Sequence, residues 1–278
     1  MKDVSVQVIH SKGVGVINED VPLVIGNTFA AFDGVTSLVG YKNAHGETGG
    51  RIAARLAAET FAKGEGYLRA RALHANTAIR HAMEKVGVNL SAEDHKENRW
   101  GAVCAAVELH EDTFDVLTIG DSFVLGITAD HWGMGELLTP YVNLDIKTLR
   151  RCKELADARV RNINQQLRPH ILKVRNQANE AYGVLNGDPN VSGFIQTNTR
   201  NIRDFQSLLI FTDGFLIPHE DPDAEEEWDL MVRLYKEGGL KAVLSEIRAR
   251  EQTDPNCWHF PRVKVGDDAT AIAIDFLP

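Results

Sequence analysis

The sequence has few cysteines and no pair of them at metal-binding spacing. Its three cysteines, Cys104, Cys152 and Cys257, lie far apart and are odd in number, so we expect no disulfide framework. It has no C-x-x-C pair and its ten histidines are scattered, so the sequence does not indicate a zinc site. This cysteine usage favours a cytoplasmic location.

The chain also lacks long apolar runs and an excess of positive charge. No stretch approaches 18 uninterrupted apolar residues, and residues 1–13 contain no signal-peptide core. The formal net charge of −9 argues against a protein that coats nucleic acid or an anionic membrane. We therefore expect neither nucleic acid nor a membrane among its partners.

Motifs of several catalytic classes are missing as well. There is no G-x-S-x-G elbow, no Walker A loop and no cysteine in a C-x₅-R-like setting. The stretch Phe-Asp-Gly-Val-Thr at 32–36 suggests a haloacid-dehalogenase-type phosphatase. That chemistry needs a nucleophilic aspartate two residues before Asp33, where Ala31 stands, so we reject it.

The sequence does have enough apolar residues for a large core, 44% of 278. Amphipathic spacing predicts helices over 49–61 and 66–87, and further helices are predicted over 221–239 and 240–250. Apolar runs of strand length cover residues 5–9, 22–26, 28–32, 101–110, 114–120, 122–128, 207–212 and 269–277. Because the predicted site needs strands from both ends of the chain, we expect residues 1–278 to form a single domain.

The segment 143–182 differs from the rest of the chain. It is helix-like and carries nine basic side chains against four acidic ones, and Pro169 predicts a break or kink within it. A solvated helical face is one interpretation of this charge. The alternative is a docking surface for a phosphorylated or acidic partner. We expect a basic helical excursion near the site.

Four acidic turns lie at the ends of predicted strands, at 32–34, 119–121, 212–214 and 266–268. A glycine beside the aspartate permits a tight turn in each case. Several carboxylates aimed at one point repel one another, so this arrangement makes sense around cations. All-oxygen ligands favour Mg²⁺, Mn²⁺ or Ca²⁺. The sequence therefore predicts a hydrolase that uses hard divalent metals.

The order of these motifs resembles the metal-dependent serine/threonine protein phosphatases (the PPM family, type 2C), of which the chain is identified as a divergent member. The match runs from about residue 10 to the end of the sequence. The motifs that carry it are Asn18-Glu19-Asp20, Asp33-Gly34, Ile119-Gly120-Asp121-Ser122, Leu138-Thr139-Pro140, Phe211-Thr212-Asp213-Gly214 and Asp267-Asp268-Ala269-Thr270.

The resemblance implies an α+β fold, a four-layer αββα sandwich in which two antiparallel sheets are flanked by helices. It also implies two Mg²⁺ or Mn²⁺ ions at one edge, with a possible third. Asp33, Asp213 and Asp267 are the implied catalytic residues: Asp33 bridges both metals, and the other two complete one metal site.

The second metal site is implied to consist of the Gly34 carbonyl with Glu19 or Asp20, and sequence alone leaves that choice open. Asp121 is implied to hold a third, weaker ion, although Gly-Asp-Ser is also a good structural turn. The expected activity is hydrolysis of phosphoserine or phosphothreonine in a protein through a metal-activated water. A phosphorylated protein is thus the expected partner.

Two departures from the family pattern concern the substrate. Gly15 stands where many members carry an arginine that binds the substrate phosphate. Val35 stands where members carry a methionine or a histidine, and that histidine is sometimes proposed to protonate the leaving group. Lys12, Arg51 or Arg99 could supply the missing charge. The alternatives are a degenerate phosphatase fold that serves as a binding or regulatory module, or a phosphatase of a non-protein phosphomonoester.

Overall fold

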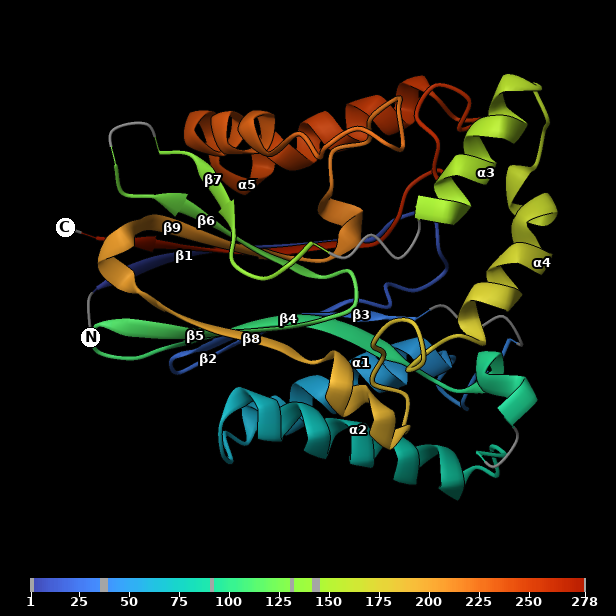
Figure 1. The fold of residues 1–278 in the computed structure, drawn as a ribbon, viewed down its shortest axis with the longest axis horizontal. Coiled ribbons are helices and arrows are strands. Elements are labelled where there is room, and N and C mark those ends of the chain that lie inside the picture. The colour runs from blue at the N-terminus through green and yellow to red at the C-terminus, as the bar shows by residue number, and fades with distance from the viewer. Residues whose placement is uncertain (1–2, 36–39, 91–92, 131–132, 142–145, 278) are drawn as a thin grey trace.

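In the described part of the chain, ten strands form two antiparallel sheets that lie face to face in the computed structural model (Figure 1). The structure describes residues 3–35, 40–90, 93–130, 133–141 and 146–277. Sheet A has the order β1 (Val4–Ser11), β10 (Ala269–Phe276), β9 (Phe205–Phe211), β6 (Phe123–Thr128), β7 (Gly135–Leu137). Sheet B has the order β2 (Val21–Ile25), β3 (Thr28–Gly34), β4 (Ala102–Leu109), β5 (Thr113–Ile119), β8 (Gln196–Asn201).

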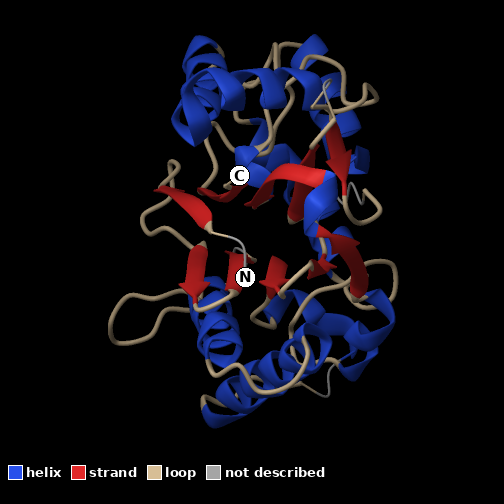
Figure 2. Cartoon of the chain, turned by 90° about the vertical axis from the view of Figure 1, so that its left-hand side faces the viewer, coloured by secondary structure: helices blue, strands red, loops and turns tan. Residues whose placement is uncertain are grey.

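Helices cover the outer face of each sheet, as Figure 2 shows from the side. Helices α1 (Gly49–Ala62) and α2 (Leu68–Lys85) pack on sheet B, and α5 (Trp228–Thr253) packs on sheet A. Helices α3 (Ile146–Asp157) and α4 (Ile163–Arg175) pack on each other at one end of the sandwich (Figure 1). Short 3-10 helices span Glu93–Asn98, Pro189–Phe194, Ile202–Asp204 and Asp213–Phe215. Within the described residues, no helix has the length and apolar character needed to cross a bilayer.

The side chains of the central strands alternate between two cores, as the period of a strand requires. In β3, Phe29 and Ala31 pack between the sheets, whereas Ala30 and Phe32 pack against α1 and α2. In β10, Ile272 and Ile274 lie between the sheets, and alanines at 269, 271 and 273 face α5. Small residues on the outer face let the helices approach closely, so apolar runs become strands buried on both faces.

The expected four-layer αββα sandwich of the α+β class is confirmed, and all eight predicted strands are present. Three details differ from the expectations. Helix α5 begins at Trp228 rather than at residue 221, α4 continues through Pro169, and the short strands β7 and β8 were not predicted. Of the segment 143–182, residues 143–145 lie outside the described residues.

The chain passes from sheet B to sheet A in the turn between β5 and β6, at Gly120. Gly120 has a φ of +75°, and a Cβ atom there would lie 2.4 Å from Cγ1 of Val103. Both the backbone conformation and the close approach of β4 therefore require glycine at this turn. The turn places Asp121 at the end of the sandwich.

We expect Gly120→Ala to destabilise the protein more than the matched Gly26→Ala. Both residues have a positive φ, but nothing lies within 4 Å of a Cβ atom at Gly26. Left-handed strain costs about 1–2 kcal/mol at either position, and overpacking against Val103 adds about 1–3 kcal/mol at Gly120 alone. Chemical denaturation measures both losses, and equal losses would contradict this account of the turn.

Candidate metal centre

The acidic turns meet at one end of the sandwich. Asp33 lies near the end of β3, Asp121 between β5 and β6, Asp213 after β9 and Asp267 before β10. The end of β9 and the start of β10 are neighbours because Phe211 pairs with Ala271. Together with Gly34, these four aspartates line one hollow, here called the acidic hollow.

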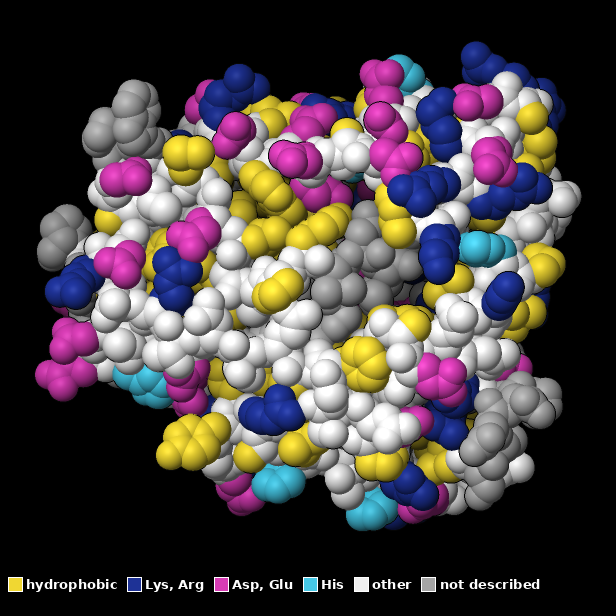
Figure 3. Space-filling model, viewed as in Figure 1, with side chains coloured by type: hydrophobic (Ala, Val, Ile, Leu, Met, Phe, Trp, Pro, Cys, Tyr) yellow, Lys and Arg dark blue, Asp and Glu magenta, His cyan; other side chains and the backbone are white. Residues whose placement is uncertain are grey.

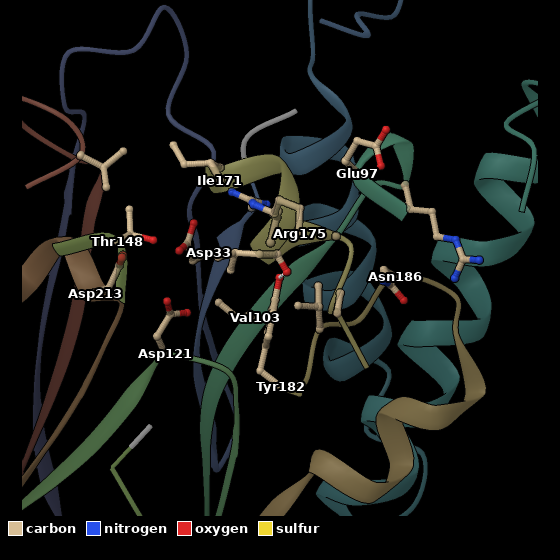
Figure 4. A pocket seen from close by; sticks show the side chains of 18 of the residues that line it. Asp33, Glu97, Val103, Asp121, Thr148, Ile171, Arg175, Tyr182, Asn186 and Asp213 are labelled. Carbon is tan, nitrogen blue, oxygen red and sulfur yellow. Dashed lines mark hydrogen bonds between the residues drawn. The ribbon is translucent and has the colours of Figure 1, made fainter. Parts of the chain in front are cut away.

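Strand alternation aims Asp33 into this hollow. It follows Phe29 and Ala31 at intervals of two residues, so its side chain continues the row that points between the sheets. Figure 4 shows Asp33, Asp121 and Asp213 around one space. The described residues offer the carboxylates of Asp33 and Asp213 no hydrogen-bond donor.

Asp268 holds the segment with Glu19 and Asp20 against the end of β10. Its carboxylate accepts hydrogen bonds from the backbone N–H groups of Gly13 (2.8 Å) and Glu19 (2.7 Å). Glu19 in turn accepts a hydrogen bond from the hydroxyl of Thr48, the N-cap of α1, and lies in a neighbouring hollow that also contains Asp267. Asp268 is thus a positioning residue for the N-terminal acids.

Asp20 is completely buried beside the cluster. Its Oδ2 accepts a hydrogen bond from the Thr212 hydroxyl at 2.8 Å, but its Oδ1 has no hydrogen-bond partner. A buried carboxylate oxygen without a donor is costly unless a cation or a proton satisfies it. Together with the unpartnered carboxylates of Asp33 and Asp213, this orphaned oxygen makes the residues present a fit for hard cations.

The raised pKa values of the clustered carboxyl groups also indicate a site that suits cations. Burial, with the charge of Asp267, raises the pKa of Asp33 to about 6. Burial and the charge of Asp33 raise the pKa values of Asp20 and Asp213 well above the usual range of a carboxyl. In the absence of a cation, these groups oppose one another's ionisation, as is typical of convergent carboxylates.

Sequence reasoning missed a cation inside the cluster. Nζ of Lys264 lies 2.6 Å from Oδ1 of Asp267. Burial lowers the pKa of Lys264, but the charges of Asp267, Asp33 and Asp213 outweigh it and raise that pKa above its ordinary value. The only sequence signal was its place three residues before Asp267.

The expected substitutes for the missing arginine do not all reach the site. Lys12 bonds the Val16 carbonyl, and Arg51 bonds the Asp20 carbonyl, and neither lines the acidic hollow. Arg99 does line it but is paired with Asp188 at 3.3 Å. Arg175, the last residue of α4, also lines this hollow, although it was not among the expected substitutes.

A second hollow adjoins the acidic one and shares Asp121, Asp213 and Asp267 with it. Its other lining is largely apolar and includes Phe123, Tyr141, Leu149, Leu216, Pro222 and Pro261. On the face shown in Figure 3, lysine and arginine side chains gather over α3 and α4, and a separate hydrophobic patch lies near α5. Three of the carboxylates thus line both hollows.

In the described part of the chain, one group of three His, Cys, Asp or Glu side chains has ligand atoms that all lie within 4.8 Å of one another. This group consists of Glu108, His110 and Asp115. It lies at the other end of β3, where Thr28 pairs with Glu108. Glu108 is already paired with buried Arg71 at 2.6 Å, and His110 with Asp115 at 3.0 Å. This group is therefore an ion-pair cluster. The carboxylate oxygens around Asp33 do not all lie within 4.8 Å of one another and are more widely spaced.

Comparisons with known proteins agree on one family. The sequence profile of the family described as protein phosphatase 2C matches residues 23–247. Among curated proteins, no significant match was found. Three solved structures that are 14–20% identical to this chain share its fold, and likeness at this level shows the fold alone.

The first is the catalytic domain of the serine/threonine protein phosphatase PstP in complex with two manganese ions, with a TM-score of 0.57 and 14% identity over 99% of both chains. The second is the serine/threonine phosphatase Stp1 from Staphylococcus aureus, with a TM-score of 0.60 and 14% identity over 99% of this chain and 96% of that one. The third is the PPM Ser-Thr phosphatase MsPP from Mycobacterium smegmatis in complex with cacodylate, with a TM-score of 0.53 and 20% identity over 99% and 98%.

We expect the metal-free protein to lose stability as the pH rises from 4 through 6. The folded-state pKa of Asp33, about 6, lies above its ordinary value of 3.8, so its favourable contribution is full below pH 4 and is lost as the pH passes 6. The loss from this group is ~3 kcal/mol, and the raised pKa values of Asp20 and Asp213 act in the same direction.

Thermal melts of the metal-free protein and of Asp33→Asn across this pH range measure the effect. The variant should show a shallower decline, because it cannot ionise at position 33. Mn²⁺ should raise the melting temperature more at pH 7.5 than at pH 5, since protons compete for the same oxygens. Parallel pH profiles for the two proteins would contradict the assignment to Asp33.

Proposed function

Because this chain belongs to the protein phosphatase 2C family, we propose that it is a Mg²⁺- or Mn²⁺-dependent phosphatase that hydrolyses phosphoserine or phosphothreonine in proteins. The observation that carries the proposal is the convergence of Asp33, Asp121, Asp213 and Asp267 on the acidic hollow, in which the carboxylates of Asp33 and Asp213 receive no hydrogen bond from the described residues. Beside the hollow, Oδ1 of the buried Asp20 also has no hydrogen-bond partner. Retention of Asp33, Asp213 and Asp267 favours catalysis over the alternative of a degenerate binding or regulatory module.

The roles of the ligands follow the family pattern and are part of the proposal. Asp33 would be a ligand of both ions, and Asp213 and Asp267 would be further ligands of one of them. The Gly34 carbonyl, with Glu19 or Asp20, would hold the other. Asp121 would hold a third ion at the boundary between the two hollows.

Two divalent ions, when bound, would activate a water and offset the charge that develops on the phosphoryl group. The chain's own contribution is to hold the ligands in place before the substrate arrives. Asp268 fixes Glu19 through its backbone N–H, and Thr212 fixes Asp20 through its hydroxyl. Val35 has no ionisable group, so position 35 cannot protonate the leaving oxygen.

The shape of the surface supports a protein as the substrate class. The apolar hollow continues from the carboxylates along Phe123, Tyr141 and Leu149, which offers contact area to residues that flank a phosphorylated side chain. A small phosphomonoester would leave this surface unused. A non-protein phosphomonoester remains the alternative substrate, and a cytoplasmic location remains a prediction.

The catalytic proposal predicts Mn²⁺-dependent hydrolysis of an aryl phosphate by the full chain. Asp33→Asn should lower kcat by at least roughly 100-fold, because it removes a negatively charged ligand from the centre of the site. A steady-state assay over a range of Mn²⁺ concentrations measures this.

Asp112→Asn is the matched control, since Asp112 is exposed in the β4–β5 hairpin at the opposite end of β4 from the site. It should retain wild-type kcat. Absence of metal-dependent turnover, or equal turnover by Asp33→Asn, would favour the degenerate module.

The protein-substrate proposal predicts a preference for a phosphopeptide over free phosphoserine. Flanking residues that contact the apolar hollow should raise kcat/KM on the peptide by about tenfold or more, since remote binding energy contributes to catalysis. Release of inorganic phosphate from both substrates gives the ratio. A ratio near one would favour a small phosphomonoester as substrate.

A further inference from the structure

Four basic side chains line the acidic hollow, and three of them already have acidic partners. Lys264 pairs with Asp267 at 2.6 Å and Arg99 with Asp188 at 3.3 Å. Lys96 pairs with Glu180. The fourth is Arg175, whose guanidinium makes no hydrogen bond or ion pair with the described part of the chain. Its donors are therefore available to a ligand in the hollow.

The fold holds the backbone of Arg175 in place. It is the last residue of α4, and the carbonyl of its neighbour Val174 accepts a hydrogen bond from the Tyr182 hydroxyl at 3.1 Å. On the other side, Oδ1 of Asn176 accepts a hydrogen bond from the backbone N–H of Glu97 at 3.3 Å. A cation in the last turn also suits the helix dipole. The arginine is thus presented by a fixed support.

Arg175 faces the carboxylates rather than bulk solvent. It is half-buried, and Figure 4 shows its side chain beside Asp33 in the pocket. Its positive charge lowers the pKa of Asp33, against the larger raising effects of burial and Asp267, so the two groups are within electrostatic reach. An anion bound in the hollow would therefore contact the Arg175 guanidinium and also any metal ions that the carboxylates bind.

The loop between β1 and β2 lacks the arginine that binds the substrate phosphate in many family members. Gly15 occupies that position, and the described residues of the loop from 12 to 18 contribute only Lys12, which is exposed and bonded to a backbone carbonyl. An arginine presents a planar fork of N–H donors that matches two phosphate oxygens.

We propose that Arg175 binds the phosphate group of the substrate, so that α4 supplies the cation that the first loop lacks. The proposal rests on the proposed function, because it assigns a substrate contact at that site. The proposal also gives the basic α3–α4 segment a role in substrate binding, through the side chain of Arg175 alone. The rival role for Arg175 is to offset the negative charge of the carboxylates without touching the substrate.

The experiment compares Arg175→Gln with Lys173→Gln in the full chain loaded with Mn²⁺. Lys173 is exposed, lies two residues earlier on α4 and does not line the hollow, so its variant removes the same charge from the same helix. The readouts are KM and kcat on an aryl phosphate, the dissociation constant of inorganic phosphate by calorimetry, and the dissociation constant of Mn²⁺.

Arg175→Gln should weaken inorganic phosphate binding and raise KM by about 10- to 100-fold, as expected for loss of a charge-assisted bidentate contact. Its Mn²⁺ affinity should be equal to or tighter than that of the wild type. Lys173→Gln should stay within about twofold on every readout. Arg175→Lys should recover part of the loss, because it retains the charge but not the fork.

Unchanged phosphate affinity and KM in Arg175→Gln, with an active wild type, would overturn the assignment and leave the proposed function intact. A change confined to Mn²⁺ affinity would establish the rival role and equally overturn it. If the wild type does not hydrolyse the aryl phosphate, the proposed function fails. In that case, loss of phosphate binding in Arg175→Gln alone would still support the assignment.

Discussion

Mutual repulsion of carboxylates at one end of the sandwich is the constraint on which the rest of the structure depends. Several acids can converge there only because rigid elements hold each of them, and because cations offset part of their charge. Lys264 contributes one such charge directly at Asp267, and Arg175 contributes another near Asp33. The remaining negative charge is what the hard cations that we propose for the hollow would offset.

The rigid elements come from distant parts of the chain, so the site is as much a product of packing as of sequence motifs. Asp268 links the start of β10 to backbone N–H groups at Gly13 and Glu19, about 250 residues earlier. Thr212, after β9, fixes Asp20. The turn at Gly120 carries the chain between the sheets and delivers Asp121. Each bond fixes one acid relative to another strand.

Much of this arrangement could be predicted because strand periodicity and turn chemistry are local properties. The row of Phe29, Ala31 and Asp33 is visible in the sequence, and so is the order of the acidic turns. Strand β8 could not be predicted, since its polar sequence forms a strand only by pairing with β5. Arg175 was missed for a related reason: its approach to Asp33, 142 residues earlier, depends on how α4 packs. The metal ligands themselves stay predictions.

The pairing of β1 bears on how the protein becomes active during synthesis. Strand β1 is the edge of sheet A, and its neighbour in that sheet is β10, more than 250 residues later. Until β10 has left the ribosome, β1 lacks its partner strand. Asp267 and Asp268, which directly precede β10, are not yet held in place by the sheet. Such long-range closure makes folding slow and late. The acidic hollow therefore cannot be complete before β10 has been synthesised, because Asp267 directly precedes that strand.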